Sequence, residues 1–600
     1  MTEEKRITFS ALVLIFLFFL GLSVFINLPA LQKQFLFADE AIYYAMTQSL
    51  AQDADLEYTH KDLLRYYQAF PSGPLGIFLK KGKDNKIFFA KSFAYPLFAA
   101  PFVKIFGSNG FLVFHSLLLF LILLMGYTYF CLSNRPSLSL LFILTFLFAS
   151  IAVVYFIWIS PDFFNLFLVF SVVFLWLYKI KYSEKEKQDK TKSRLQSFLQ
   201  SSWSDYLACA LVAIAVFSKP PNVVLMGPLV LYALFKKKLL KAFLMVLIFL
   251  LISGLFWGTN YLVTGEWNYQ GGERKTFYGP QYPLEKEGIT FDSLGHEMTS
   301  EGYGGKHLLP PRVFIYNLFY YFWGRFTGIT WYFFPAFLFL ILFFFGKKRL
   351  YQWLIFTALF AEILIYIILM PDNYAGGGGA LANRYFLNIY PLFLFLPGLK
   401  KSYKEIGLSW IMASLFISQI LFSPMLHSHF PATHAKKFPF KALPVELTLI
   451  NNIPTNTNPN AHRQKVGTES QNAWIYFLDD NFHPKLEPSG FWTKGPQAAE
   501  IILKTWFPVK KLIFHLHNNP RMRNDITVKV GRQKKIITLP KNQWGTLEFP
   551  VKKGFHMKAT HLFKIKVKAS KGSIPYYEDT TSRERRFLGV FFELEIIPEE

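Results

Sequence analysis

Two adjacent carboxylates, Asp39 and Glu40, follow directly after an apolar run from about residue 7 to residue 31. The pair therefore lies where a membrane-spanning helix would end and water would begin. Burying both charges in lipid would be costly, and a solvated loop has no special need for two neighbouring acids. Asp39 is therefore the first candidate for a reacting group.

Further polar residues, from parts of the chain far apart in sequence, follow other apolar runs or lie in the long loops between them. When these positions face one side of a membrane, two acidic positions and several cations meet at a single lipid–water boundary. Such a set suits a substrate with a phosphate in the head-group layer and a second substrate that approaches from water. The set comprises Asp39, Glu40, Lys91, Asp162, Lys219, Arg325, Asn383 and Arg384.

The composition indicates a mainly α-helical, polytopic membrane protein. Of the 600 residues, 52% are hydrophobic and 19% are aromatic, and apolar runs of spanning length recur along the chain. The net charge of +25 fits cytoplasmic loops and contact with anionic lipid head groups. No nucleic-acid recognition motif accompanies the charge, so no nucleic-acid partner is expected. The two cysteines, Cys131 and Cys209, provide neither a disulfide framework nor a metal cluster.

The elements that must position the polar set are about eleven transmembrane helices. The basic N-terminus and the length of the first run predict a retained signal anchor, with the N-terminus in the cytoplasm. Basic clusters at 236–238, 347–349 and 400–401 close short connections on that same side. The C-terminus and the long loops 32–110 and 264–328 then lie outside. The expected spans are 7–30, 111–131, 138–159, 163–179, 204–218, a sixth that ends before 236, 242–263, 329–346, 351–370, a tenth between 385 and 400, and 405–424.

The two outer loops contain apolar segments of their own. Residues 88–106 carry Lys91, Pro96 and Pro101, which predicts helices lying at the interface and not a full span. The segment from Arg312 to Trp323 has the pattern of an amphipathic helix.

Residues 426–600 differ in composition and predict an extracytoplasmic β-sandwich. Apolar residues alternate with polar ones in several short runs, such as 512–516, 526–530, 563–567 and 590–596. Residues 425–600 contain 27 lysines and arginines against 15 aspartates and glutamates, a net charge of +12. Because long domains are translocated regardless of charge, this excess does not conflict with the topology. The excess also fits an acidic partner surface.

Five short motifs occur in order on the expected outer side. They are Asp39-Glu40 with Tyr43-Tyr44, the stretch Lys91-Ser92-Phe93-Ala94-Tyr95-Pro96-Leu97, Ser160-Pro161-Asp162, Ser218-Lys219-Pro220, and Asn383-Arg384-Tyr385-Phe386 with Tyr390-Pro391. Together they resemble motifs of the GT-C superfamily of membrane glycosyltransferases, over about residues 7–425. The resemblance is to bacterial enzymes similar to protein O-mannosyltransferases and lipid A aminoarabinose transferases. Lys91 is followed by Ser-Phe where many relatives carry a proline.

The resemblance implies an inverting glycosyltransferase at the outer face of the bacterial inner membrane. It would transfer a sugar from a polyprenyl-phosphate donor to a hydroxyl of an envelope glycan, lipid or protein. Asp39 would be the general base, and Glu40 would orient Asp39 or the acceptor. Asp162 would orient the acceptor or hold a divalent cation, although many relatives with monophosphate donors need no metal, so no cofactor is assigned.

The remaining site residues have simpler alternatives. Lys91, Lys219 and Arg384 would hold the donor phosphate. Asp162, however, also suits the N-cap of a helix, and Lys219 suits a snorkelling helix end. Arg384, a bidentate donor after a glycine-rich loop, is the best phosphate candidate. Candidate substrate contacts are Tyr43, Tyr95, Arg325, Asn383 and Tyr385.

Two other function classes compete with transfer. A transporter or flippase for a lipid-linked glycan would show inverted repeats or charges at the membrane midplane, whereas here the charges lie at one face. A non-enzymatic membrane protein whose β domain binds envelope glycans would leave the one-sided charges unexplained.

Overall fold

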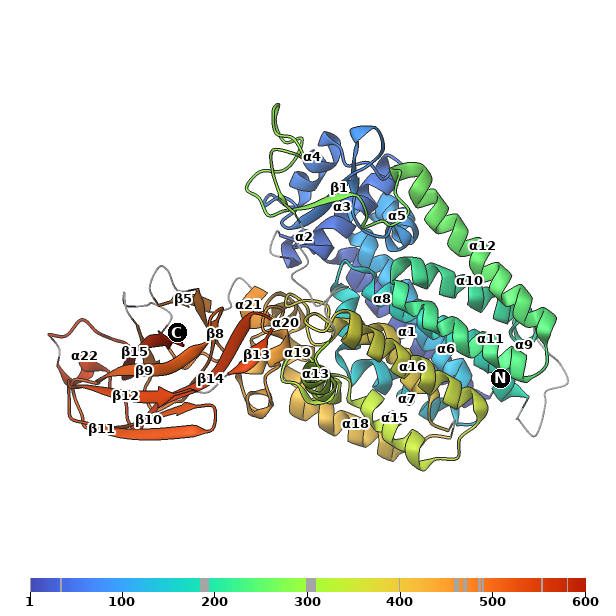
Figure 1. Cartoon of the computed structure of the whole chain (residues 1–600). Helices are drawn as coiled ribbons and strands as arrows, with labels where there is room; N and C mark the ends of the chain where they lie inside the picture. Colours follow the sequence, from blue (N-terminus) through green and yellow to red (C-terminus); the bar gives the residue numbers. More distant parts are fainter. Residues whose placement is uncertain are drawn as a thin grey trace. The chain divides into compact units, whose positions relative to one another are not determined.

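The computed structural model describes residues 2–599, except for 33–34, 184–193, 298–308, 399, 458–462, 468–471, 484–486, 488–489, 552–553 and 580. The chain forms two compact units (Figure 1). The first consists of Met1–His307, Ile329–Met370 and Asn383–Met425, and the second of Leu308–Gly328, Pro371–Ala382 and Leu426–Glu600.

Long apolar helices dominate the first unit. Within the described residues, five helical stretches are long and apolar enough to cross a membrane, and two bent pairs raise this to seven if each pair is one span. These helices indicate a multi-pass membrane protein. The five are α1 (Glu3–Phe25), α5 (Ala94–Phe106) together with α6 (Gly110–Phe130), α8 (Pro161–Tyr182), α12 (Leu239–Thr264) and α16 (Leu350–Leu369). The bent pairs are α7 (Pro136–Phe148) with η3 (Ile151–Ile157), and α9 (Arg194–Gln200) with α10 (Trp203–Ser218).

The eleven expected spans do not appear as eleven long helices in the described part of the chain, because several apolar runs are interrupted. The third run bends by 70° at Ser150, whose side chain caps the following 3-10 turn by accepting from the Ala152 N–H. Pro220 and Pro335 lie in the first turn of new helical segments at the start of the sixth run and within the eighth. The shorter apolar helices of the described chain are the stretch Pro220–Phe235, which ends with α11 (Met226–Phe235), and α15 (Phe334–Phe345). Two further helices of this unit are α17 (Arg384–Phe395) and α18 (Tyr403–Phe416).

The two loops 32–110 and 264–328 meet in a small antiparallel sheet that the sequence did not predict. Its strand order is β2-β1-β3-β4. The pairing of β1 with β3 sets Lys80 opposite Arg274 and Phe78 opposite Thr276. The interfacial helix expected over 88–106 begins only at Ala94, after β2. The elements are α3 (Asp39–Gln52), α4 (His60–Ala69), β1 (Ile77–Lys81), β2 (Ile87–Phe89), β3 (Glu273–Phe277) and β4 (His296–Glu297).

The second unit contains two sheets around one apolar core, in agreement with the alternating pattern of residues 426–600. One sheet has the order β11-β10-β14-β8-β6-β5, with β13 paired to β14, and the other has the order β12-β9-β15-β7. Leu512, Phe514 and Leu516 of β9 point into the shared core, as do Val590 and Phe592 of β15.

The second unit also includes α13 (Pro311–Trp323), which confirms the predicted helix near Arg312. The strands are β5 (Arg463–Val466), β6 (Ala473–Phe477), β7 (Phe491–Lys494), β8 (Ala499–Thr505), β9 (Val509–Asn518), β10 (Asn524–Val530), β11 (Gln533–Leu539), β12 (Trp544–Pro550), β13 (Phe555–Met557), β14 (Thr560–Ala569) and β15 (Leu588–Pro598).

Candidate functional site

Asp39 is the first residue of α3, at the positive end of the helix dipole. The chain enters the helix through Ala38, whose φ of +51° is unusual for a residue with a side chain. The Ala38 N–H donates to the carbonyl of Leu75 at 2.8 Å, which anchors this turn. The backbone therefore holds the Asp39 side chain in a defined position.

Two cations bind the two oxygens of Asp39. Lys91 Nζ lies 2.8 Å from Oδ1, and the Arg384 guanidinium donates to Oδ2 at 2.8 Å. All three side chains are less than one-fifth exposed. Burial raises the pKa of the Asp39 carboxyl, but the charges of Lys91 and Arg384 more than offset this and hold the pKa well below its usual range. Asp39 is therefore a carboxylate at any physiological pH.

Asp162 binds the other side of Arg384. It lies in the first turn of α8 and is nearly buried, and it accepts a hydrogen bond from the Ser160 hydroxyl at 2.7 Å. Lys219 Nζ lies 2.5 Å from its Oδ1, and Arg384 Nε lies 3.9 Å from its Oδ2. Arg384 thus stands between two carboxylates, each of which also has a lysine. The structure brings together five of the eight polar residues singled out in the sequence.

Glu40 points away from this chain of ion pairs. Its Oε1 accepts the Ile159 N–H at 3.2 Å, which ties the start of α3 to the segment that precedes Asp162. Burial is the largest influence on its carboxyl, and together with the negative charges of Asp39 and Asp162 it raises the pKa of Glu40 to about 7. The pKa of Asp39 is therefore lowered while the pKa of its neighbour Glu40 is raised.

Arg274 is a further cation near Asp39 that sequence reasoning missed. It lies on β3, and both its guanidinium and Lys91 Nζ stand 5.0 Å from the centre of the Phe78 ring. Its Nε is buried and makes no hydrogen bond within the described residues. Burial lowers the pKa of Arg274, and the negative charge of Asp39 opposes this shift. No motif marks Arg274 in the sequence, since only the pairing of β1 with β3 places it here.

The tyrosines of the sequence motifs take different positions. The partly exposed Tyr385 ring lies 5.4 Å from Lys219 Nζ and 5.6 Å from the Arg384 guanidinium. Tyr43 and Tyr95 pack edge to face and are almost fully buried. The Tyr95 hydroxyl is bound to His115 Nε2 at 2.9 Å. The structure therefore gives Tyr95 a packing role beneath the site and leaves Tyr385 beside the cations.

Asn383 and Arg325, two further expected substrate contacts, bind other groups of the protein. Asn383 is the N-cap of α17, where its Oδ1 accepts the Phe386 N–H at 3.0 Å and fixes the start of the helix that carries Arg384. Arg325 belongs to the second unit, where it is 1% exposed and bound to Glu500 at 3.0 Å. Backbone carbonyls of Lys441 and Leu443 also accept hydrogen bonds from its guanidinium. This burial corrects the expectation of a substrate contact at Arg325.

Glu362 is a second residue that sequence reasoning missed. It is fully buried in α16, and its Oε1 accepts a hydrogen bond from the Asn388 amide at 2.6 Å. Asn388 in turn binds Asn222, whose N–H donates to the carbonyl of Lys219 at 3.1 Å. This buried network supports the turn that presents Lys219. The sequence feature that could have pointed to Glu362 is its position as a lone acid inside the apolar run 351–370.

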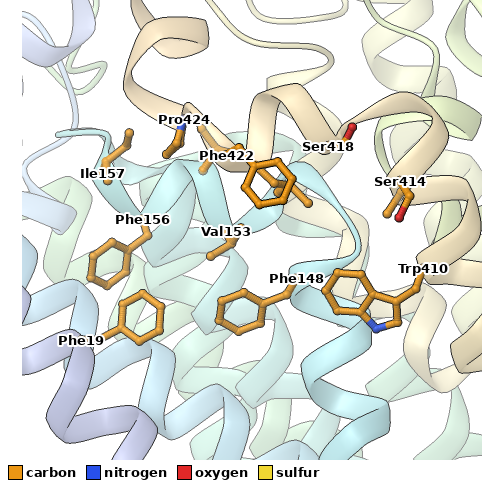
Figure 2. Close-up of a pocket in the computed structure, with 13 residues that line it drawn as sticks. Phe19, Phe148, Val153, Phe156, Ile157, Trp410, Ser414, Ser418, Phe422 and Pro424 are labelled. Carbon is orange, nitrogen blue, oxygen red and sulfur yellow. The ribbon is translucent and has the colours of Figure 1, made fainter. Parts of the chain in front are cut away.

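The first unit contains an apolar cavity of about 400 Å³ (Figure 2). Several of its lining residues, up to Ile157, come shortly before Asp162 in the sequence. Phe148 and Trp410 line it from different helices, as Figure 2 shows. Ile157 also lines it, and Ile159, two residues later, binds Glu40. The lining residues are Phe19, Phe148, Val153, Val154, Phe156, Ile157, Trp410, Ala413, Ser414, Ser418, Leu421, Phe422 and Pro424. A hydrocarbon chain suits such a lining.

Metal ligation is not evident in the described residues, where no group of three or more His, Cys, Asp or Glu side chains converges. Asp39 and Asp162 are instead each bound by two basic side chains.

Comparison with known proteins identifies no family. No family model matches the chain, and neither does any curated protein sequence. Among solved structures, the chain is similar to the arabinosyltransferase EmbB from Mycobacterium smegmatis, with 9% sequence identity and a TM-score of 0.31. The match covers 100% of this chain and 64% of EmbB. Because this TM-score is low, the proposals below rest on the residues of this chain.

Proposed function

We propose that the chain is an inverting glycosyltransferase that moves a sugar from a polyprenyl-phosphate donor to a hydroxyl acceptor. The observation that supports this is the position of Arg384 between Asp39 and Asp162, with Lys91 and Lys219 on either side. Two carboxylates and three cations from five separate segments meet at one place. Sugar transfer from a phosphate donor needs both, a base for the acceptor and cations for the leaving group.

The cations would hold the donor phosphate. A phosphate that enters the site competes with the carboxylates for Lys91 and Arg384, and Arg274 adds a guanidinium whose Nε has no hydrogen bond within the described chain. Charge-assisted, bidentate contacts of this kind are the strong ones for phosphate. Lys219, also held by Asp162, lies on the other side of Arg384.

The reaction would be a single displacement. Asp39 takes the proton of the acceptor hydroxyl, the acceptor oxygen forms a bond to the anomeric carbon, and the bond from that carbon to the phosphate oxygen breaks. The electron pair stays on the polyprenyl phosphate, where the cations stabilise it. Attack from the side opposite the phosphate inverts the anomeric configuration. Contact of the phosphate with Lys91 and Arg384 weakens their hold on Asp39 and so raises its basicity.

The polyprenyl chain would lie in the apolar cavity. Two observations support this placement. The cavity lining is apolar, and the lining residue Ile157 lies two residues before Ile159, whose N–H donates to Glu40. The proposed orientation puts the site at the outer face of the bacterial inner membrane, with the second unit extracytoplasmic and an envelope glycan, lipid or protein as acceptor.

The test uses the full chain in proteoliposomes with sugars labelled on polyprenyl phosphate or on a nucleotide. We expect release of polyprenyl phosphate and label transfer to acceptor only with the lipid-linked donor. Movement of intact donor across the bilayer without cleavage would instead identify a transporter. Failure of every lipid-linked donor with a folded protein would contradict the proposal.

Arg274→Ala should weaken donor binding more than it slows the chemical step. Loss of one charged contact to the phosphate should raise KM for the donor by about tenfold, which is about 1.4 kcal/mol. Steady-state kinetics with varied donor concentration measures this effect. Lys81→Ala is the matched control, since Lys81 lies on the paired strand but binds Asp292 on the surface. Equal KM values for wild type and Arg274→Ala would remove Arg274 from the phosphate site.

Glu40 should give the activity a dependence on pH near 7. Its carboxyl is neutral below about pH 7 and ionised above it, because its pKa is raised to about 7. The added negative charge raises the basicity of Asp39 and stabilises positive charge developing on the sugar. We expect kcat to rise about two- to threefold between pH 6 and 8, on the scale of a few tenths of a kcal/mol for a partly screened charge.

Glu40→Gln should remove this rise and leave a flat profile, because Asp39 is ionised throughout the same range. Survival of the rise in Glu40→Gln would assign it to another group.

A further inference from the structure

The outer face of the four-stranded sheet in the second unit carries one row of aromatic rings. The backbone register sets Trp544 of β12 opposite His517 of β9, His517 opposite Phe591 of β15, and Phe591 opposite Trp492 of β7. The row therefore crosses all four strands of this sheet, of which β12, β9 and β15 are labelled in Figure 1. Because side chains alternate along a strand, these four rings face away from the core that the neighbouring residues fill.

The rings contact one another along the row. His517 stacks on Trp544 with centroids 4.8 Å apart and an interplanar angle of 17°. Phe591 meets Trp544 at 6.0 Å and Trp492 at 5.5 Å. Trp492 and Phe591 are nearly buried and, with Leu588, form a small apolar cluster separate from the main core. They fix the row in place, while Trp544 remains 54% exposed.

Trp544 is thus an ordered, exposed indole on an edge strand. An exposed tryptophan costs solubility, and an edge strand is where proteins usually place charged residues against aggregation. Here His517 covers one face of the indole, and its Nε2 is bound to Asn542 Oδ1 at 3.2 Å. Such an immobilised ring loses little entropy when a ligand packs on it.

Hydrogen-bonding groups lie in the next row of the same face. Thr546, His515 and Glu593 oppose one another across β12, β9 and β15. His515 Nε2 is 2.9 Å from Glu595 Oε2, and Thr546 Oγ1 is 3.5 Å from His515 Nδ1. A flat ring therefore borders carboxylate, imidazole and hydroxyl groups that exchange hydrogen bonds with hydroxyls.

The charges on this face distinguish between ligand classes. Residues 425–600 have a net charge of +12, yet the described strand residues on this face include the carboxylates Glu548, Glu593 and Glu595 beside the lysines Lys494 and Lys511. Lys511 is also neutralised by Glu548 at 3.0 Å. Among these described strand residues the carboxylates outnumber the lysines, so the strands of this face are not complementary to an anionic polymer or to anionic lipid head groups.

We infer that this aromatic row is a binding site for a neutral glycan chain. The C–H face of a sugar ring packs on the open face of Trp544, and the sugar hydroxyls bind Glu595, His515 and Asn542. The site requires neither donor nor transfer, so it goes beyond the proposed activity and is testable without it.

The test measures binding of soluble neutral oligosaccharides of four to eight sugars to the full chain in detergent by isothermal titration calorimetry. The panel includes glucans, mannans and arabinans, with dextran sulfate as an anionic polymer. We expect at least one neutral oligosaccharide to bind, and Trp544→Ala to weaken it by at least about tenfold. Trp506→Ala is the control, because Trp506 is 38% exposed in the same domain but stands against Lys504, outside the row.

Trp544→Phe keeps a ring and should retain most of the affinity, which separates loss of stacking from loss of folding. Equal affinity of wild type and Trp544→Ala, or the absence of binding across the neutral panel, would overturn the inference. Preferential binding of dextran sulfate would also overturn it. A Trp544-dependent change of oligomeric state in light scattering would instead identify the face as a contact between copies of this chain.

Discussion

Asp39→Asn should lower kcat for sugar transfer by about 10²–10⁴-fold and leave the protein folded. The amide keeps the size of the side chain and one acceptor oxygen for its cationic neighbours, but it no longer accepts a proton. Because the pKa of Asp39 lies well below its usual range, Asp39 is ionised throughout, and a large loss should persist at every pH between 5 and 8. Initial rates with the lipid-linked donor measure the effect, and thermal unfolding checks the fold.

Asp292→Asn is the matched control for this substitution. Asp292 also binds a lysine, Lys81 at 2.9 Å, but its side chain is 59% exposed. We expect it to retain nearly full activity, since exposed ion pairs contribute little. An Asp39→Asn protein that folds and turns over like wild type would show that Asp39 is not the base.

Arg384→Lys should be the second most damaging change, with a loss of about 10²–10³-fold in kcat/KM. A lysine keeps the charge but cannot reach Asp39 and Asp162 together, which the guanidinium does through Nη1 and Nε at 2.8 and 3.9 Å. The planar fork is also what binds a phosphate at two oxygens. The KM for the donor shows how much of the loss is in donor binding, and single-turnover rates show how much is in the chemical step.

Arg384→Ala should in addition destabilise the protein, by about 3 kcal/mol or more, because it leaves the nearly buried Asp162 carboxylate with Lys219 alone and Asp39 with Lys91 alone. Arg65→Lys is the control, since Arg65 likewise binds two carboxylates, Asp53 and Asp62, but away from the acidic pair. If Arg65→Lys and Arg384→Lys lose activity equally, the effect on Arg384 is structural and not a property of the phosphate site.

The contacts among the charged residues follow from a simple feature of the sequence. Asp39, Asp162, Lys219 and Arg384 each stand at the end of an apolar run, and charged residues are excluded from lipid but tolerated at its boundary. Helices that share a membrane bring their ends to common depths, so residues far apart in sequence meet there. The five short sequence motifs contain these same four residues, so they predicted the same group without any argument about depth in the membrane.

Other site residues had no such local signal. Arg274 reaches the cluster because β3 pairs with β1, and antiparallel pairing between two long loops depends on contacts nearly 200 residues apart. The different proton affinities of Asp39 and Glu40 depend on which neighbours each carboxyl faces, and adjacent residues in a helix turn face different neighbours. Arg325 belongs to the loop 264–328 in the sequence, yet it is buried with Glu500 in the second unit.

The sequence by itself determined the class of the molecule: long apolar helices, a C-terminal β domain with alternating strands, and acids and cations at helix ends. Burial of apolar area and exclusion of charge act on each segment separately, so composition and periodicity reveal them. Only the tertiary structure decided where the apolar runs break, which cations bind Asp39, and that Trp544, His517, Phe591 and Trp492 form one row. These outcomes depend on register and packing between distant segments, and a shift of one residue in a strand would turn that row into the core.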